Sequence, residues 1–248
     1  MYDSVLTETV TITGAGGDPI EAYASRPLQP GPLGGVVVIH HMPGYDRQTK
    51  EIVRRFAEEG YNAICPNLYT REAPGADPDD AAAAARSLGG VPDDRLVGDV
   101  AGAASSLRGL TNANGRVGVI GYCSGGRQAF LAGCSLDLQA AVDCYGAFVI
   151  EPVPDGFPLK AGPIGHLAKD LSCPLLGLFG VEDAHPSPEA TGELEQLLSA
   201  ADKEYEFRTF ENAGHAFFAV ERPSYRPEAA VEGWKLILDF YGRHLSGR

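Results

Sequence analysis

The run "GYCSGG", which begins at Gly121, places a thiol between glycines where the apolar stretch "RVGVI" gives way to "RQAFLAG". This is the form of a nucleophile elbow, a sharp strand-to-helix turn, with Cys123 at the apex that serine usually holds. The residues two before and two after the apex pass close together in such a turn, and Gly121 and Gly125 meet that demand. Ser124 does not fit the same frame, because Tyr122 would occupy its upstream small position. The pattern predicts Cys123 as a nucleophile and the backbone N–H of Ser124 as an oxyanion donor at a helix N-terminus.

A thiol nucleophile needs a base, and the base needs a group that orients it. Along the chain, elbow enzymes place the nucleophile first, then the acid, then a histidine. The segment "LLGLFGVEDAHP" presents Asp183 at the end of one predicted strand, and "FENAGHAFF" presents His215 at the end of another. The order predicts His215 as the base and Asp183 as its orienting group. The alternatives are Glu182 as the orienter, His185 as the base, and a glycine-rich turn around an inert thiol.

Strands that alternate with helices are expected to bring these residues together. Continuous apolar runs predict strands buried on both faces, and apolar residues at helical spacing predict helices between them. The alternation indicates an α/β fold with a mainly parallel central sheet and helices on both faces. Function in such sheets gathers beyond the carboxyl ends of the strands. The loops that should meet there follow Ile39, Ile120, Phe179 and Phe210.

Several other segments carry local signals. The stretch "ETVTITGAGGDPIEAYASRP" predicts a β-hairpin, and Ser187 and Pro188 are the expected N-cap and first residue of a helix. A polar, proline-rich loop is expected from Thr70 to Asp80, either as a cover for the pocket or as a surface connection. No repeat or linker is visible, which predicts a single domain over residues 1–248. One face of a C-terminal helix is expected to carry Val231, Trp234, Leu238, Tyr241 and Leu245.

Composition and charge exclude several classes of protein. The formal net charge of -13 would repel a phosphate backbone, so we expect no nucleic-acid partner. The cysteines number five and form no CxxC pair, which argues against a disulfide framework or a zinc knuckle. No basic region followed by an apolar stretch opens the chain, and no apolar run is long enough to span a bilayer. The expected location is the cytoplasm, with no membrane partner.

The chain resembles the dienelactone hydrolase family, the carboxymethylenebutenolidase-like α/β-hydrolases. The resemblance runs from "VVVIHHMPGYD" to "LILDFYGRHL" and includes "GYNAICPNLYTREAPG", "GRVGVIGYCSGG", "AVDCYGAF", "GVEDAHPSP" and "NAGHAFF". It implies the α/β-hydrolase fold and a triad of Cys123, Asp183 and His215. It also implies a second oxyanion donor, the backbone N–H of Met42, and a pocket position for Tyr145.

The chain departs from the family pattern at two places. The family carries a glutamate that pairs with the resting thiol, and His41, preceded by His40, stands at the matching position. We expect both histidines near the pocket; because adjacent residues of an extended segment point opposite ways, they would make a poor metal site. The family's substrate-binding arginines would fall near Ala84 and at Ala219. The basic residues close to those positions in sequence are Arg71, Arg86, Arg222 and Arg226.

The residues together predict a carboxylic ester or lactone hydrolase that works through a thioester on Cys123. This chemistry needs no cofactor and no metal, and the expected partner is a small-molecule substrate of a monomer or homodimer. A thioesterase or acyltransferase with the same thiol is one alternative. A non-catalytic hydrolase fold that binds a ligand is another. A redox-sensing thiol is the third, although Cys134 lies too far along the same predicted helix to be an obvious resolving partner.

Overall fold

The structure is a computed structural model that describes residues 4–246. The first three residues of the segment inspected for a signal peptide, and both ends of the predicted 1–248 domain, lie outside this range. The described residues form an eight-stranded sheet with the strand order β1-β2-β4-β3-β5-β6-β7-β8. The strands are β1 (Val5–Thr13), β2 (Pro19–Pro27), β3 (Leu33–Ile39), β4 (Asn62–Pro66), β5 (Ala113–Tyr122), β6 (Ala140–Cys144), β7 (Leu175–Gly180) and β8 (Tyr205–Phe210).

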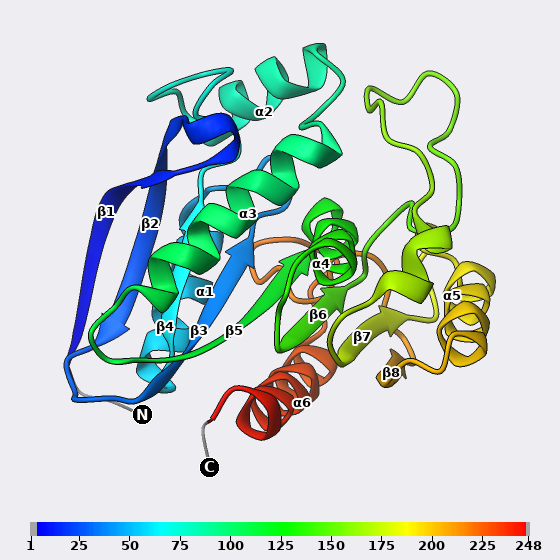
Figure 1. The fold of residues 1–248 in the computed structure, drawn as a ribbon. Helices are drawn as coiled ribbons and strands as arrows, with labels where there is room; N and C mark the ends of the chain where they lie inside the picture. Colours follow the sequence, from blue (N-terminus) through cyan, green and yellow to red (C-terminus); the bar gives the residue numbers. More distant parts are fainter. Residues whose placement is uncertain (1–3, 247–248) are drawn as a thin grey trace.

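The sheet is mainly parallel, as the sequence predicts. Strands β1 and β2 form the expected antiparallel hairpin, and β2 also pairs antiparallel with β4. Every pairing from β4 to β8 is parallel. The carboxyl ends of β3, β5, β7 and β8 therefore open toward one edge, which brings the four predicted loops to the same side of the sheet (Figure 1).

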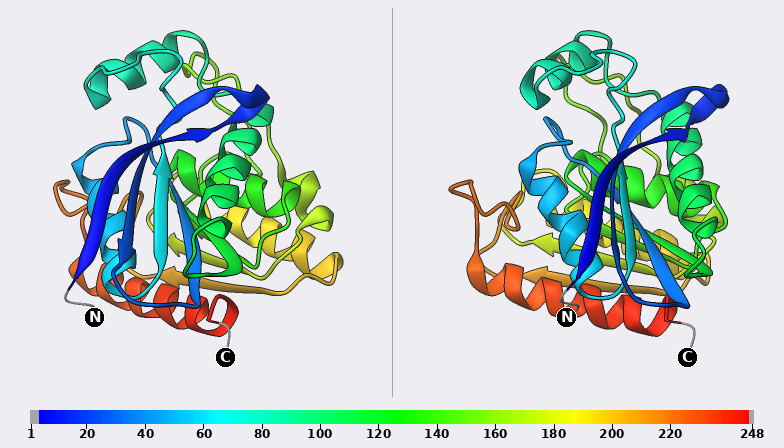
Figure 2. Two further views of the ribbon diagram at one scale, coloured as in Figure 1. Left: turned by 60° about the vertical axis from the view of Figure 1, so that its left-hand side comes forward. Right: turned by 90° about the vertical axis from the view of Figure 1, so that its left-hand side faces the viewer.

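Helices cover both faces of the sheet (Figures 1 and 2). Buried side chains of α1 and α6 pack in the core on one face, and those of α2, α3, α4 and α5 pack in the core on the other. Both faces of the central strands are covered, which explains why Val36 to Ile39 form an uninterrupted apolar run without any exposed side chain. The helices are α1 (Arg47–Glu58), α2 (Pro78–Ser87), α3 (Asp93–Arg108), α4 (Ser124–Ser135), α5 (Pro188–Ala200) and α6 (Pro227–His244).

Helix boundaries agree with the local signals, with two differences. The Ser187 side chain accepts a hydrogen bond from the N–H of Ala190, which confirms it as the N-cap of α5. The loop predicted from Thr70 to Asp80 ends earlier, because Pro78 fits the first position of α2. Of the residues predicted to line one face of α6, Trp234 and Tyr241 are buried, whereas Val231 is 53% exposed. Ile237, which was not in the predicted set, is also buried.

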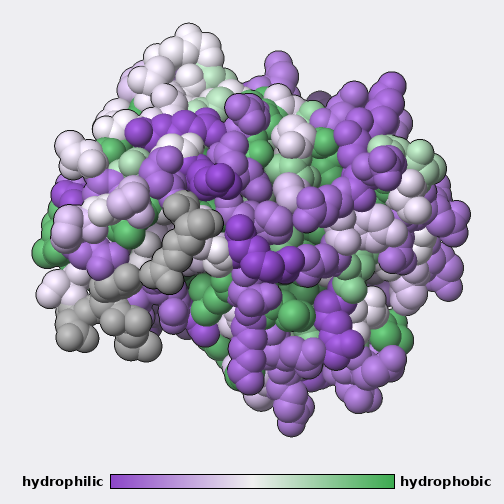
Figure 3. Space-filling view, turned by 60° about the horizontal axis from the view of Figure 1, so that its bottom comes forward, coloured by the Kyte–Doolittle hydropathy of each residue, from purple (hydrophilic) through white to green (hydrophobic). Residues whose placement is uncertain are grey.

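One face of the molecule is shown in Figure 3. It is mostly hydrophilic, and its hydrophobic residues occur in small patches between hydrophilic ones. Among residues 4–246, no helix has the length and apolar character that crossing a bilayer requires.

Candidate active site

Cys123 stands at the turn from β5 into α4. Its backbone angles, φ 57° and ψ −121°, are strained for a residue with a side chain. The strain follows from how tightly the turn is folded. A Cβ added at Gly121 would overlap the backbone of Gly125, and one added at Gly125 would crowd the carbonyl of Ile39 at the end of β3. Only glycines at these two positions let β3, β5 and the start of α4 approach this closely and hold the thiol outward.

His215 and Asp183 come together on the loops after β8 and β7. The Nδ1 atom of His215 lies 2.9 Å from Oδ2 of Asp183, whose side chain is only 1% exposed. Burial disfavours the charged imidazole, but hydrogen bonds to Asp183 and Cys123 outweigh it and raise the pKa of His215 to about 10. The buried carboxylate of Asp183 thus favours the protonated form of His215. The other candidates lie outward: Glu182 is exposed, and His185 pairs with Glu151 at 3.1 Å.

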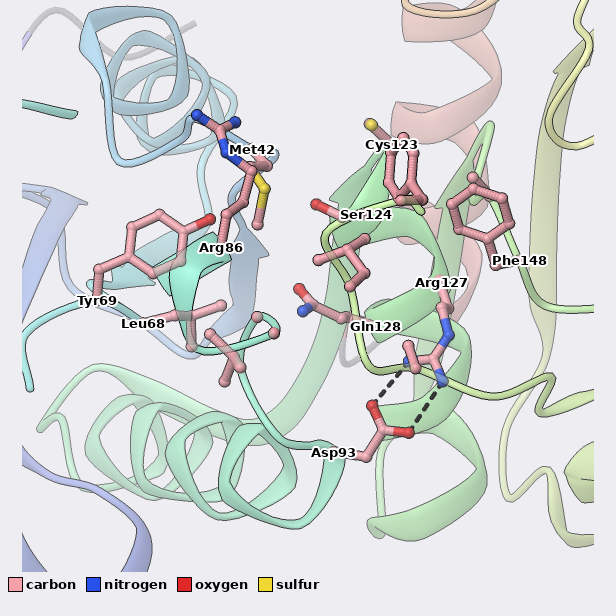
Figure 4. A pocket seen from close by; sticks show the side chains of 17 residues that line it. Met42, Leu68, Tyr69, Arg86, Asp93, Cys123, Ser124, Arg127, Gln128 and Phe148 are labelled. Atoms are coloured by element: carbon pink, nitrogen blue, oxygen red, sulfur yellow. Dashed lines mark hydrogen bonds and ion pairs between the residues drawn. The ribbon is translucent and has the colours of Figure 1, made fainter. Parts of the chain in front are cut away.

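A cavity of about 200 Å³ opens beside Cys123, and we call it the large cavity. Figure 4 shows Leu68, Tyr69 and Arg86 on one side of it, opposite Ser124, Gln128 and Phe148. Its wall also includes Phe157, Leu159 and Ala161 from the segment after β6. Within the described residues, nothing from the loop predicted from Thr70 to Asp80 lines this wall. The cover of the cavity therefore comes largely from a segment without a predicted role.

A second, smaller cavity of about 20 Å³, here the small cavity, lies on another side of Cys123. Residues from the loops after β3, β6 and β8 line it, together with α1. Tyr145 contributes its buried ring, whose centre is 5.2 Å from that of His215. The thiol thus borders two spaces of very different size. The lining of the small cavity includes His41, Met42, Gln48, Cys123, Tyr145 and Arg222.

The neighbouring histidines have different surroundings. His40 is 2% exposed and lines neither cavity. Its Nε2 accepts a hydrogen bond from the N–H of Leu68 at 3.2 Å, so Nδ1 carries the proton and donates to the carbonyl of His41 at 2.9 Å. Burial lowers the pKa of His40 to about 4. His41 lines the small cavity instead, and its Nε2 lies 3.1 Å from Oδ2 of Asp46.

Two residues are expected to supply the backbone N–H groups of an oxyanion hole. Met42 and Ser124 both line the large cavity with Cys123, as Figure 4 shows. Within residues 4–246, neither N–H donates to an acceptor in a loop or a side chain. Ser124 is also the first residue of α4, where the helix dipole favours an anion. That these two N–H groups form an oxyanion hole stays a prediction.

The four arginines named from the sequence separate into two pairs. Arg86 lines the large cavity and Arg222 the small one, and neither forms an ion pair with any residue between 4 and 246. Arg71 is used in the fold, bound to Asp99 at 2.9 Å. Arg226 likewise donates to backbone carbonyls, including that of Asn212.

Sequence reasoning missed two buried polar groups near the site. Arg127 on α4 lines the large cavity and is held by both oxygens of Asp93, at 2.7 and 2.9 Å (Figure 4). Asp143 is fully buried at the end of β6, where burial raises its pKa to about 7. It accepts a hydrogen bond from the N–H of Gly146 at 2.7 Å. A polar residue inside an otherwise apolar strand or helix is the one signal that could have identified them.

Comparisons with known proteins identify the family of the chain. A model of the dienelactone hydrolase family matches residues 20–245. A protein of Escherichia coli strain K12 named "Putative carboxymethylenebutenolidase" is 34% identical over 252 residues, covering 98% of this chain and 89% of that protein. A Bradyrhizobium protein named "Probable 2-oxo-3-(5-oxofuran-2-ylidene)propanoate lactonase" is 27% identical and 98% of each chain is covered.

A solved structure shares the fold over nearly its whole length. The crystal structure titled "Putative Dienelactone Hydrolase", from Klebsiella pneumoniae, superposes with a TM-score of 0.86 at 31% identity, covering 98% of this chain and 100% of that one. A puromycin-hydrolysing peptidase of Mycobacterium tuberculosis matches at 21% identity and a TM-score of 0.72, which supports the fold alone. The chain therefore belongs to the dienelactone hydrolase family and has the α/β-hydrolase fold of that family.

Proposed function

We propose that this protein hydrolyses small carboxylic esters or lactones with Cys123 as nucleophile, His215 as base and Asp183 as orienter. The observation that carries the proposal is the hydrogen bond of 2.9 Å between His215 and the buried Asp183, beside a thiol at the apex of a nucleophile elbow. A non-catalytic fold would have no need of a strained apex thiol aligned with this pair. The curated relatives, which carry carboxymethylenebutenolidase and lactonase names, support the same class of reaction.

The first half of the reaction forms a thioester. His215 takes the thiol proton, the sulfur of Cys123 attacks the acyl carbon, and the carbonyl electrons move onto oxygen. The N–H groups of Ser124 and Met42 would hold this oxyanion, and such a donor contributes roughly 3–4 kcal/mol to the transition state. When the tetrahedral intermediate collapses, the bond to the leaving oxygen breaks and His215 gives that oxygen its proton. Asp183 keeps the imidazole in the required orientation throughout. The chemistry requires no cofactor.

The two cavities indicate the shape of the substrate. The large cavity is mostly apolar and suits a hydrocarbon or ring portion of the ester. Arg86 and Arg222 stand at different sides of Cys123 without a carboxylate partner among residues 4–246. An unpaired guanidinium in a pocket suits a carboxylate. We therefore propose that the preferred substrates carry an acidic group in addition to the scissile ester.

The test is p-nitrophenyl acetate hydrolysis by the wild type and Cys123→Ala, with mass spectrometry of acid-quenched wild type. We expect the variant to lose turnover by at least roughly 10³-fold, and an acetyl group to appear on Cys123 of the wild type. Cys134→Ala is the matched control, because that partly buried thiol lies on the same helix and lines neither cavity. Unchanged turnover in Cys123→Ala would rule out this nucleophile.

Further arms of the test separate the alternatives. A thioester substrate that outcompetes matched oxygen esters by more than tenfold would favour a thioesterase, and transfer of the acetyl group to an added alcohol would favour an acyltransferase. An absence of any adduct or turnover across esters, lactones and thioesters would favour a ligand-binding protein on a hydrolase fold.

A further inference from the structure

A second histidine–aspartate pair lies beside the same thiol, on the loop between β3 and α1. Nε2 of His41 is 3.1 Å from Oδ2 of Asp46. The other oxygen of Asp46 accepts hydrogen bonds of 2.8 Å from both the N–H and the hydroxyl of Thr49, at the start of α1. Burial alone would raise the pKa of Asp46, but the contacts with His41 and Thr49 lower it well below its usual value. The carboxylate is thus fixed in place and ionised, and it orients the imidazole of His41.

The position of His41 suits a role at the thiol. His41 and Cys123 line the same small cavity, whose volume of about 20 Å³ is enough for one water molecule, which needs roughly 10–15 Å³. With Nε2 directed at Asp46, Nδ1 remains for another partner, and it forms no hydrogen bond with any residue between 4 and 246. The side chains of Gln48 and Arg222 supply further polar groups to the same space. A water there would have several polar neighbours, with Nδ1 of His41 among them.

His215 is arranged differently, because its Nδ1 is bound to Asp183 and an interaction with Cys123 contributes to its raised pKa. A third histidine–carboxylate pair, His185 with Glu151, has a similar distance of 3.1 Å but lines neither cavity. Of these three pairs, only the one at His41 combines a fixed carboxylate with a wall of the small cavity at Cys123.

We propose that His41, oriented by Asp46, is the general base that activates water against the thioester on Cys123. This rests on the proposed function, since it requires an acyl-enzyme. Water gives a proton to Nδ1 of His41, and its oxygen forms a bond to the acyl carbon. The bond between carbon and sulfur then breaks, and its electrons return to the sulfur of Cys123. The carboxylic acid formed gives its proton to His215, which restores the imidazolium beside the thiolate, and His41 releases its own proton to solvent.

If His215 serves acylation and His41 serves hydrolysis of the thioester, changing His41 should slow only the second half of the reaction. In stopped-flow measurements with p-nitrophenyl acetate, His41→Gln should release the first equivalent of p-nitrophenol at a rate within about twofold of wild type. Its steady-state rate should then fall by roughly 10²-fold, the range expected for loss of a general base. Quenched samples should show nearly complete acetylation of Cys123, and added imidazole should restore part of the turnover. His185→Gln is the matched control and should stay near the wild-type rate.

Each other result has a definite meaning. Equal steady-state rates in His41→Gln and wild type would overturn the proposal, as would equal slowing of the burst and the steady state. Asp46→Asn, which keeps an oxygen for Thr49, provides a second variant if His41→Gln does not fold, and should also accumulate the acetyl-enzyme. If the wild type itself forms no adduct on Cys123, the proposed function is wrong. If the wild type forms the adduct and His41→Gln hydrolyses it equally fast, only the role of His41 is wrong.

Discussion

The two histidine–aspartate pairs that flank Cys123 share one kind of contact but differ in their surroundings. The distances are similar, 2.9 Å at His215 and 3.1 Å at His41. The side chain of Asp183 is 1% exposed, whereas that of Asp46 is 25% exposed and also caps α1. Water screens an ion pair, so the same geometry is worth more where the carboxylate is dry. The comparison teaches that burial, rather than distance, should rank the two pairs in their effect on the reaction.

The largest expected effect tests the buried pair. Asp183→Asn keeps the shape of the side chain but removes the charge that holds the tautomer of His215, so kcat should fall by roughly 10³- to 10⁴-fold. Steady-state kinetics with p-nitrophenyl esters measures this loss. Glu182→Gln, which changes the exposed neighbour, is the matched control. A fall in kcat of less than tenfold in Asp183→Asn would mean that burial does not make the Asp183 pair more important to the reaction than the Asp46 pair.

The side chain of His40 hydrogen-bonds to the carbonyl of His41, in the loop after β3. Because the pKa of His40 is lowered, the stability of the protein should depend on pH. The pKa of His40 is lowered from 6.5 to about 4 in the folded protein, so the unfolded chain binds the extra proton between these values. Its contribution is fully present above pH 6.5 and is lost as the pH falls toward 4, by about 3 kcal/mol at most. His40→Gln should therefore lose less stability than wild type over this window.

Urea unfolding at pH 7.5 and at pH 4.5 measures the difference. At pH 7.5 the variant should be less stable by about 1–2 kcal/mol, because the hydrogen bond to the carbonyl of His41 is lost. At pH 4.5 the gap should narrow or reverse. If both proteins lose the same free energy of unfolding between pH 7.5 and pH 4.5, His40 is not the titrating group. The proposed difference between a structural His40 and a functional His41 would then be unsupported.

A smaller change in kcat/KM is expected when the unpaired arginine of either cavity is replaced. Arg86→Gln should lower kcat/KM by about tenfold for p-nitrophenyl esters whose acyl group ends in a carboxylate, with little change for neutral esters of the same length. Arg222→Gln tests the other side of Cys123 with the same pair of substrates. The neutral ester is the internal control in each variant. If both esters decline equally, the guanidinium supports the shape of the cavity and does not recognise the acid.

The sequence was informative where local geometry determines the arrangement. Gly121 and Gly125 identify the elbow because the turn has no space for a Cβ at either position. Asp183 and His215 could be placed on a common edge because the ends of parallel strands must meet there. Both inferences use only the order of residues and the topology of a parallel sheet, so they needed no knowledge of the loops.

The walls of the cavities were not predictable in the same way. Phe157 and Arg86 reach the large cavity from an irregular segment and from the last turn of α2, and no periodicity reports where such segments fold back. The pairing of His41 with Asp46 depends on a turn with four residues between them, and the cap of α1 also closes this turn. The sequence placed His41 near the pocket, but the partner that gives it a chemical role comes from the tertiary structure alone.

The smallest expected effect concerns that exposed partner. Asp46→Asn leaves an amide oxygen to accept from Thr49, so the cap of α1 should survive and the free energy of unfolding should change by less than about 0.5 kcal/mol. The imidazole of His41 loses its ionised partner but keeps its place in the small cavity, so the steady-state rate should fall by only about three- to tenfold, with an unchanged burst. Thr49→Ser preserves both hydrogen bonds to Asp46 and is the control. A loss as large as that in Asp183→Asn would show that the screened pair is as strongly coupled to the reaction as the buried one.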